Sequence, residues 1–353
     1  MNRTVTMQQI ADRAGVSLGT VSHVINNTAK VREKLRQRVL EAIHGLGYQP
    51  SQLARGLRRN QTNMLVMIIP DVTNPFFPAV VRGVEDVAYK NSFRLVLCNT
   101  DNDARKEISY ISEMRSYRPA GWLLIPAVDS QIAEHFGSSG AGVPVVCLDR
   151  QPEGWDGDLV LVANEAGARS ATRHLLRMGH RQLAVITGPL HLGNAVERLQ
   201  GFKHALAEAK VAIEPDYIQE AGFERNSGYQ AARRLLRMLP RPTAIFACND
   251  LMALGVLLAA RELGLHCPED LSVVGFDNLD FAELTAPALT TVHQPGYQLG
   301  TTAARLLLER IAGLKDPSQQ VVLPTELKIR HSAAPPTSAH SKSKTDGEPV
   351  EVG

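Results

Sequence analysis

Residues 6–26, TMQQIADRAGVSLGTVSHVIN, constrain the fold most, because their pattern predicts two short helices joined by a tight turn. Thr6 and Gln9 have the three-residue spacing of a capping box, which marks the start of a helix. Gly15 permits the turn that ends this helix, and Ser17 is placed to cap the next one. We therefore expect a helix-turn-helix at the start of the chain rather than a helical hairpin in a larger core.

The second of these helices has two distinct faces. Its apolar positions fall at i, i+3 and i+4 and form one stripe: Val21, Val24 and Ile25. The opposite face is short and contains no acid; it carries Leu18, Gly19, Ser22, His23 and Asn26. A face of this kind suits a recognition helix that enters the major groove of DNA.

A third amphipathic helix completes a small domain at 1–49. Its apolar side is formed by Val31, Leu35, Val39, Ile43 and Leu46, and Gly47 ends it. Residues 1–60 hold ten basic and three acidic residues, a formal charge of +7, whereas the whole chain is +2, which leaves −5 for the remainder. A basic module on an acidic body is typical of a protein that presents one end to nucleic acid.

The segment 50–61 follows the head and is also basic. Pro50 and Ser51 are typical of a helix start, but so short a helix is marginal unless it folds against a partner surface. We expect a hinge helix that forms on DNA, with Leu57 inserted as a wedge into the minor groove. Ala54 would allow two such hinges to approach closely.

From Met64 the pattern changes to alternating strands and helices, which predicts parallel sheets with helices on both faces. The expected strands are 64–70, 94–98, 121–126, 144–148, 183–187, about 217–220, 244–248, 271–276 and 290–293. The expected helices are 77–91, 103–118, near 130–136, 165–178, 194–209, 227–238, 251–263 and 297–311.

Two rounds of this alternation predict a body of two similar lobes at 62–332. The first lobe is expected at about 62–162 and 292–323, since the last strand and helix should cross back to it, and the second at about 163–291 and 324–332. The tail, 333–353, has almost no apolar content and is expected to be disordered.

Together, the motifs of this chain resemble the lactose-repressor family of bacterial transcription regulators. The residues that carry the resemblance are IADRAGVSLGTVSHVIN, the GLGYQPSQLARGLR hinge, TNPFF at 73–77, GHRQLAVITGP at 179–189, ND at 249–250, GFDN at 275–278 and LTTVHQP at 289–295. The resemblance spans Thr6 to about Arg330. It implies a body like a periplasmic sugar-binding protein, with two Rossmann-like lobes around a ligand, and a homodimer on a palindromic operator.

Polar and aromatic residues follow the expected strands, where ligands of open parallel sheets bind. They are Asn74, Phe76, Phe77, Asp149, Arg150, Arg198, Phe223, Asn249, Asp277 and Gln294. Carboxylates accept from sugar hydroxyls, Arg and Asn donate to them, and rings cover the C–H faces of a sugar. These positions also match the ribose contacts of the ribose-binding branch, to which the resemblance is closest.

For the head, we expect the DNA-contacting residues to be Thr6, Ser17, Leu18, Gly19, Thr20, Ser22, His23, Asn26, Ala54, Arg55 and Leu57. The sequence thus predicts a repressor whose operator affinity is switched by a small sugar, with D-ribose as inducer. The alternatives are a repressor of the same family that senses a purine or another pentose and, third, a sugar-binding protein without DNA function.

Other classes fit the sequence less well. No G-x-G-x-x-G follows a strand, and the GxSxG match at 15–19 lies between helices rather than at a strand-to-helix turn, so we expect no enzyme and no cofactor. Cys98, Cys147, Cys248 and Cys267 lack metal-ligand spacing and are expected to be reduced thiols, with no metal site. No apolar segment has the length of a membrane span or the form of a signal peptide, so a cytoplasmic protein is expected.

Overall fold

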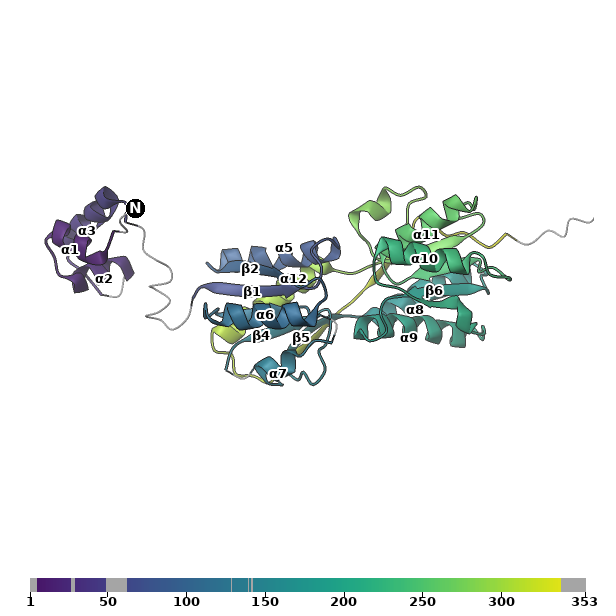
Figure 1. Cartoon of the computed structure of the whole chain (residues 1–353), viewed down its shortest axis with the longest axis horizontal. Helices are drawn as coiled ribbons and strands as arrows, with labels where there is room; N and C mark the ends of the chain where they lie inside the picture. The colour runs from purple at the N-terminus through teal and green to yellow at the C-terminus, as the bar shows by residue number, and fades with distance from the viewer. Residues whose placement is uncertain are drawn as a thin grey trace, which may run out of the picture. The chain divides into compact units, whose positions relative to one another are not determined.

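The computed structural model describes residues 5–26, 29–48, 62–127, 129–138, 140 and 142–337. These residues belong to two compact units, a helical head and an α/β body that begins at Met64 (Figure 1). The expected hinge 50–61, with Ala54, Arg55 and Leu57, lies outside the described residues, as does most of the expected tail.

The head is a three-helix domain, as its sequence predicts: α1 (Met7–Ala14), α2 (Leu18–Asn26) and α3 (Glu33–Leu46). The capping box forms, because the backbone N–H of Gln9 donates to Thr6 Oγ1 at 3.3 Å and that of Thr6 donates to Gln9 Oε1 at 2.9 Å. Gly15 ends α1 with a φ of 59°, in the left-handed region that favours glycine. The core consists of Ile10, Ala11, Ala14, Val21, Val39 and Ala42.

The first lobe is built on a six-stranded parallel sheet in the order β11-β5-β4-β3-β1-β2. Its strands are β1 (Met64–Ile69), β2 (Arg94–Asn99), β3 (Gly121–Leu124), β4 (Val145–Leu148), β5 (Asp158–Val162) and β11 (Gln320–Leu323), and its helices are α5 (Phe76–Lys90), α6 (Ala104–Arg115), α7 (Ile132–Phe136) and α12 (Gly296–Ile311). Alternate residues of β1 enter two different cores. Leu65, Met67 and Ile69 pack with α5 and α12, whereas Val66 and Ile68 pack with α6 and α7. The unbroken apolar run of β1 is explained by this burial on both faces.

The second lobe repeats the plan with the order β12-β10-β9-β8-β6-β7. Its strands are β6 (Leu183–Thr187), β7 (Ile218–Glu220), β8 (Ala244–Ala247), β9 (Ser272–Asp277), β10 (Thr290–His293) and β12 (Glu326–Lys328), and its helices are α8 (Asn164–Arg177), α9 (Gly193–Glu208), α10 (Arg225–Leu235) and α11 (Asp250–Glu262), with 3-10 turns at Pro215–Tyr217 and Asp280–Glu283. Every pairing is parallel except that of β12 with β10. In both sheets the first strand lies between the second and the third, so each has a topological switch point at which ligands bind.

The chain crosses between the lobes three times, and one crossing differs from the prediction. It passes from β5 to α8 at Ala163, from β10 to α12 near Pro295, and from β11 to β12 near Pro324. We expected the strand 290–293 to cross back to the first lobe, but β10 pairs in parallel with β9 in the second sheet. Of this strand and the helix that follows it, α12 is the one that returns to the first lobe, where its apolar face packs against α5.

Residues 333–337 also differ from the expected tail, because they are held against the second lobe. The backbone of Ala334 donates to Ser272 Oγ at 3.0 Å, and the Ala334 carbonyl lies 2.9 Å from Nε2 of the buried His180. Thr337 Oγ1 donates to the Glu269 carbonyl at 2.7 Å. These short polar contacts need no apolar pattern, which is why composition alone did not predict them.

Among the described helices, none combines the length and apolarity that a membrane crossing requires.

Candidate functional site

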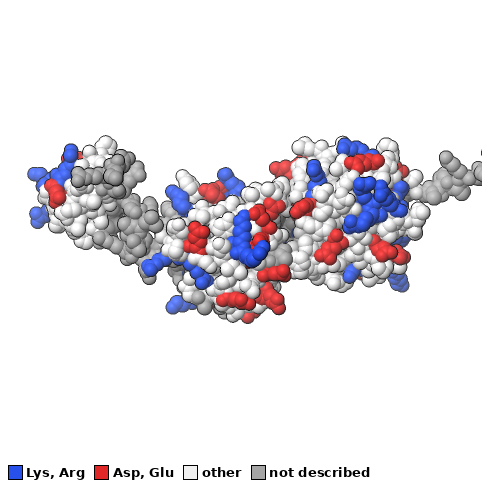
Figure 2. Space-filling model, viewed as in Figure 1, with Lys and Arg blue, Asp and Glu red and all other residues white. Residues whose placement is uncertain are grey.

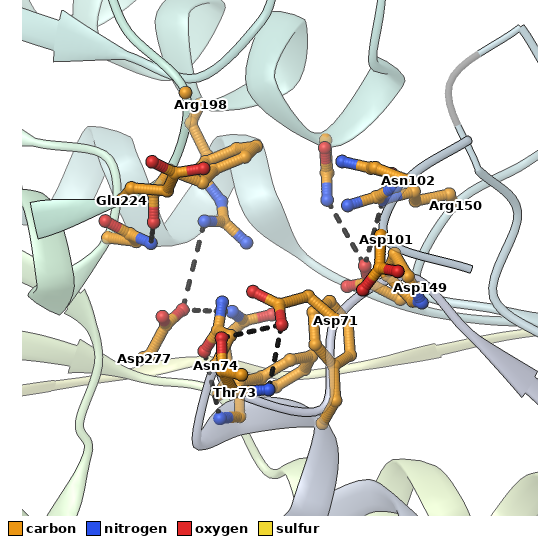
Figure 3. Close-up of a pocket in the computed structure, with 18 residues that line it drawn as sticks. Asp71, Thr73, Asn74, Asp101, Asn102, Asp149, Arg150, Arg198, Glu224 and Asp277 are labelled. Atoms are coloured by element: carbon orange, nitrogen blue, oxygen red, sulfur yellow. Dashed lines mark hydrogen bonds and ion pairs between the residues drawn. The ribbon is translucent and has the colours of Figure 1, made fainter. Parts of the chain in front are cut away.

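A cavity of about 320 Å³ lies between the two lobes, at the carboxyl ends of both sheets (Figure 3). Its volume is at the small end of the usual range for small-molecule sites. All ten residues predicted from the strand ends line it: Asn74, Phe76, Phe77, Asp149, Arg150, Arg198, Phe223, Asn249, Asp277 and Gln294. The structure therefore brings together residues that are more than 200 positions apart in the chain.

The second lobe contributes an acid and a base to the cavity. Asp277 ends β9 with a φ of 122°, and its Oδ1 accepts from Gln294 Nε2 at 2.5 Å. Arg198 reaches from α9 toward the same carboxylate, with Nη1 3.9 Å from Asp277 Oδ1. The guanidinium is fixed by donation to the Cys248 carbonyl at 2.6 Å and by its position 4.0 Å over the ring of Phe276. Burial raises the pKa of Asp277 well above its ordinary value, and Arg198 opposes that shift.

The first lobe contributes a second acid and base. Asp149 follows β4 in a left-handed conformation, with φ at 64°, and is buried beside Arg150, whose Nε lies 3.6 Å from Asp149 Oδ2. Arg150 is held on its far side, where Nη1 donates to Asn102 Oδ1 and to the Pro126 carbonyl, each at 2.9 Å. Burial raises the pKa of Asp149, and the two arginines of the cavity lower it.

One hydrogen bond of the cavity joins the lobes directly. Asn194 Nδ2, at the start of α9 in the second lobe, donates to Asp149 Oδ2 of the first lobe at 3.3 Å. Sequence reasoning missed Asn194, because it stands seven residues beyond the end of β6 rather than next to it. It also missed Asp101 and Asn102, although both follow β2 directly; the strand-end rule applied to β2 would have found them.

Aromatic rings form the apolar walls. Phe76 and Phe77 open α5 with their rings edge to face, 5.4 Å apart. Phe223 takes a φ of 63° and its carbonyl accepts from Asn249 Nδ2 at 2.8 Å, while Asn249 Oδ1 caps α11 through the backbone N–H of Met252. The ring of Phe223 covers Gly188, where a Cβ would lie 2.1 Å from it, so any larger residue at this position would displace the ring.

Four buried atoms of cavity-lining residues have no hydrogen-bond partner among the described residues: Asp149 Oδ1, Arg150 Nε, Asn194 Oδ1 and Gln294 Oε1. Buried polar atoms are normally paired, so a cluster of unpaired ones at a cavity indicates groups that serve a ligand. Three of the four are acceptors and one is a donor. A molecule that can both donate and accept at several neighbouring atoms satisfies this set, as a polyol does.

Asp250 does not line the cavity but holds the loop that follows Asp277. The side chain is fully buried at the start of α11, where Oδ2 accepts from the Leu279 backbone at 2.8 Å and Oδ1 accepts from Thr291 Oγ1 at 2.5 Å. These bonds fix the loop that follows Asp277 against β10. Gly275 leaves the space for it, because a Cβ there would lie 2.2 Å from Asp250 Oδ1.

Burial raises the pKa of Asp250 from 3.8 to about 7, and this predicts a pH-dependent stability. Between about pH 4 and 7 the folded chain binds more protons at this group than the unfolded chain, so its contribution to the unfolding free energy falls as pH rises. The difference in unfolding free energy, Asp250→Asn minus wild type, should rise over this window by up to about 1.4 kcal/mol per pH unit. Denaturant titrations at several pH values measure it; the exposed Asp280→Asn is the control, and a pH-independent difference for Asp250→Asn contradicts the prediction.

Of the predicted DNA-contacting residues that the structure describes, all except Thr6 lie on α2 or in the turn before it. Ser17 caps the helix, as expected: its Oγ accepts from the Thr20 backbone at 3.2 Å and lies 2.9 Å from Thr20 Oγ1. Leu18, Gly19 and His23 are exposed, whereas Val21 is buried against the other helices. The Thr6 side chain is engaged in the capping box of α1. Four exposed cations, Lys30, Arg32, Lys34 and Arg36, follow α2 or begin α3; on the face of the body shown in Figure 2, acids and bases are interspersed.

No group of three or more potential metal ligands occurs among the described residues. The four cysteines are free; Cys98, Cys147 and Cys248 are buried and Cys267 is partly buried. Burial raises the pKa of the Cys248 thiol to about 12, so this group is a neutral core side chain.

Comparison with known proteins matches both parts of the chain. Residues 6–51 match the model of bacterial regulatory proteins of the lacI family, and residues 172–333 match that of a periplasmic binding protein-like domain. The HTH-type transcriptional repressor PurR of Histophilus somni is 38% identical over 327 residues, which cover 93% of this chain and 98% of the relative.

Among solved structures, the lac repressor dimer bound to operator and the anti-inducer ONPF is similar with a TM-score of 0.85 and 27% identity, over 94% of this chain and all of that one. A lacI-family transcriptional regulator from Enterococcus faecium with bound ribose has a TM-score of 0.70 and 33% identity, over 78% of this chain and all of that one. With a helix-turn-helix head, a two-lobed body and this degree of identity along the chain, the protein belongs to the lacI family of bacterial transcriptional regulators.

Proposed function

We propose that this protein is a dimeric repressor that binds operator DNA through its head, and that D-ribose, bound between the lobes, releases it. The observation that carries the choice of ligand is the pair of acid and base couples at opposite ends of the cavity, Asp149 with Arg150 and Asp277 with Arg198. Each couple offers an acceptor and a donor to neighbouring hydroxyls, and the phenyl rings cover the C–H faces between them. The related regulator from Enterococcus faecium, with its bound ribose, supports this choice.

A purine is the second candidate, because the PurR relatives are 38% to 39% identical to this chain. A purine base is flat and has few hydrogen-bonding edges, so it offers fewer partners than a polyol to the four unpaired buried atoms of the cavity. These unpaired atoms therefore favour the sugar.

Calorimetric titration decides between the two. The full-length protein is titrated with D-ribose, other pentoses and hexoses, hypoxanthine and guanine. The proposal expects D-ribose to bind most tightly. Binding of hypoxanthine or guanine without binding of ribose would replace the sugar by a purine effector.

A switch is expected because both lobes contribute residues to the cavity, whereas its direction rests on the resemblance to ribose-binding repressors. Phe76 and Asp149 belong to the first lobe, and Asn249 and Asp277 to the second, so a bound sugar favours one relative angle of the lobes. Such coupling is typically worth about 1–3 kcal/mol and is reciprocal, so operator DNA must weaken ribose binding by the same factor. We propose that the favoured angle separates the hinges of the dimer and withdraws Leu57 from the minor groove. Tighter operator binding in the presence of ribose would instead make it a corepressor.

Base reading is assigned to α2, and His23 is its best candidate because it is an exposed polar side chain of that helix. We expect His23→Ala to relax specificity at one operator position by about 1–3 kcal/mol, the usual worth of a base contact. Binding is compared on operator, on single-base variants and on random DNA. An equal loss on all of them would make His23 a phosphate or packing residue.

A further inference from the structure

Arg198, the base of the second-lobe couple, is held by a buried amide that lies beside the crossing between the lobes. Asn164 is the first residue of α8, directly after the crossing at Ala163, and is 2% exposed. Its Oδ1 accepts from Arg198 Nε at 2.9 Å. The same side chain donates through Nδ2 to the carbonyl of Val162, the last residue of β5, at 3.3 Å.

The orientation of this amide is set by Glu197. Asn164 Nδ2 donates to Glu197 Oε2 at 2.9 Å, so the amide nitrogen faces the carboxylate and the amide oxygen faces the guanidinium. Glu197 is half-buried, and burial raises its pKa while the bond from Asn164 and the charge of Arg198 lower it. Oδ1 thus acts as the acceptor and Nδ2 as the donor. A flipped amide would place its NH₂ group against the Arg198 guanidinium and its oxygen against the Glu197 carboxylate.

Among the described residues that line the cavity, Arg198 is the one with which Asn164 forms a hydrogen bond. Arg198 also donates to the Cys248 carbonyl and lies over the ring of Phe276 on the core side, and it faces Asp277 and Phe223 in the cavity. Any displacement of the guanidinium toward a ligand therefore changes the contact with Asn164 and, through Nδ2, the contact with the end of the first sheet. Neither Asn164 nor Glu197 lines the cavity itself.

We infer that Asn164 and Glu197 are positioning residues, which hold the Arg198 guanidinium in its ligand-binding orientation and tie it to the crossing between the lobes. This inference rests on the proposed sugar-binding role of Arg198. The start of α8 would then affect effector affinity without contacting the ligand.

A polarity swap tests the inference. Asn164→Asp still accepts from Arg198 but faces Glu197 with a second carboxylate, whereas adding Glu197→Gln restores a donor opposite it. We expect Asn164→Asp to weaken ribose binding about 10- to 100-fold, and the double variant to bind about tenfold more tightly than Asn164→Asp alone. Full recovery is not expected, because the donor to the Val162 carbonyl is lost in both.

Matched controls separate this effect from added or removed charge. Glu165→Gln removes one negative charge, as Glu197→Gln does, but at an exposed residue. Glu165 directly follows Asn164 in α8 and is paired with His204. Asn91→Asp adds the same charge at the end of α5. Both should leave ribose affinity within about twofold of wild type, as surface changes usually do. Ribose affinity of Asn164→Asp within about threefold of wild type, or no recovery in the double variant, would overturn the inference.

A measurement without ligand keeps the inference separate from the identity of the effector. The Arg198 Nε–H proton of the ¹⁵N-labelled protein should exchange slowly with water in wild type and at least about tenfold faster in Asn164→Ala, which lacks the acceptor. Unchanged exchange would refute the positioning role, even if Asn164→Asp proves too unstable to titrate. If wild type fails to bind ribose, the proposed effector falls and this exchange experiment still decides the inference.

Discussion

Asp277→Asn is expected to weaken ribose binding about 100- to 20,000-fold and to give a repressor that ribose no longer releases from its operator. The substitution removes the carboxylate that faces Arg198 and Gln294 at the end of β9. Two hydrogen bonds from sugar hydroxyls to a charged acceptor are worth about 3–6 kcal/mol together, which gives this range. Asparagine keeps the shape of the side chain and tolerates the φ of 122° better than most residues.

The measurement pairs calorimetry of ribose binding with operator binding in the presence and absence of ribose. Operator affinity without ribose should stay close to that of wild type, because Asp277 lies in the body and not in the head. Asp280→Asn, three residues further and exposed, serves as the control. A ribose affinity for Asp277→Asn within threefold of wild type would remove Asp277 from the effector site.

Operator affinity is expected to fall about 1,000- to 100,000-fold when the salt concentration rises from 50 to 200 mM, if the two heads of a dimer together contact about six to ten phosphates. Residues 1–60 contain ten basic residues, which displace counterions from the DNA phosphates on binding. This release favours binding less as the salt concentration rises, so the affinity falls. Ribose is uncharged, so its affinity for the free protein should change little over the same range. A slope of log affinity against log salt shallower than about −3 would imply that few phosphates are contacted.

The sequence predicted the fold well where periodicity and turn chemistry agree. The caps at Thr6 and Ser17, the turn at Gly15 and the doubly buried β1 all depend on neighbours in the chain, and the structure contains each of them. The sequence also predicted the lining of the cavity, because parallel strands bring their carboxyl ends to the same side of a sheet.

The parts that were missed depend on contacts between distant segments. No helix separates β4 from β5, so the alternation rule passed over β5, and β11 and β12 are too short to show a period. The contact of Asn194 with Asp149 exists only at a particular angle between the lobes, which no local pattern encodes. The same holds for Asn164, whose role follows from its contact with Arg198 across 34 positions of the chain.

The last two strands have a consequence for how the protein is made. β11 completes the first sheet beside β5, and β12 completes the second beside β10, so the first sheet is finished only when residue 323, and the second only when residue 328, has left the ribosome. Until then β5 and β10 are open sheet edges, which can pair with the strands of other chains. A chain stopped before residue 323 has two unfinished lobes rather than one complete lobe, and aggregation or proteolysis is its expected fate during synthesis.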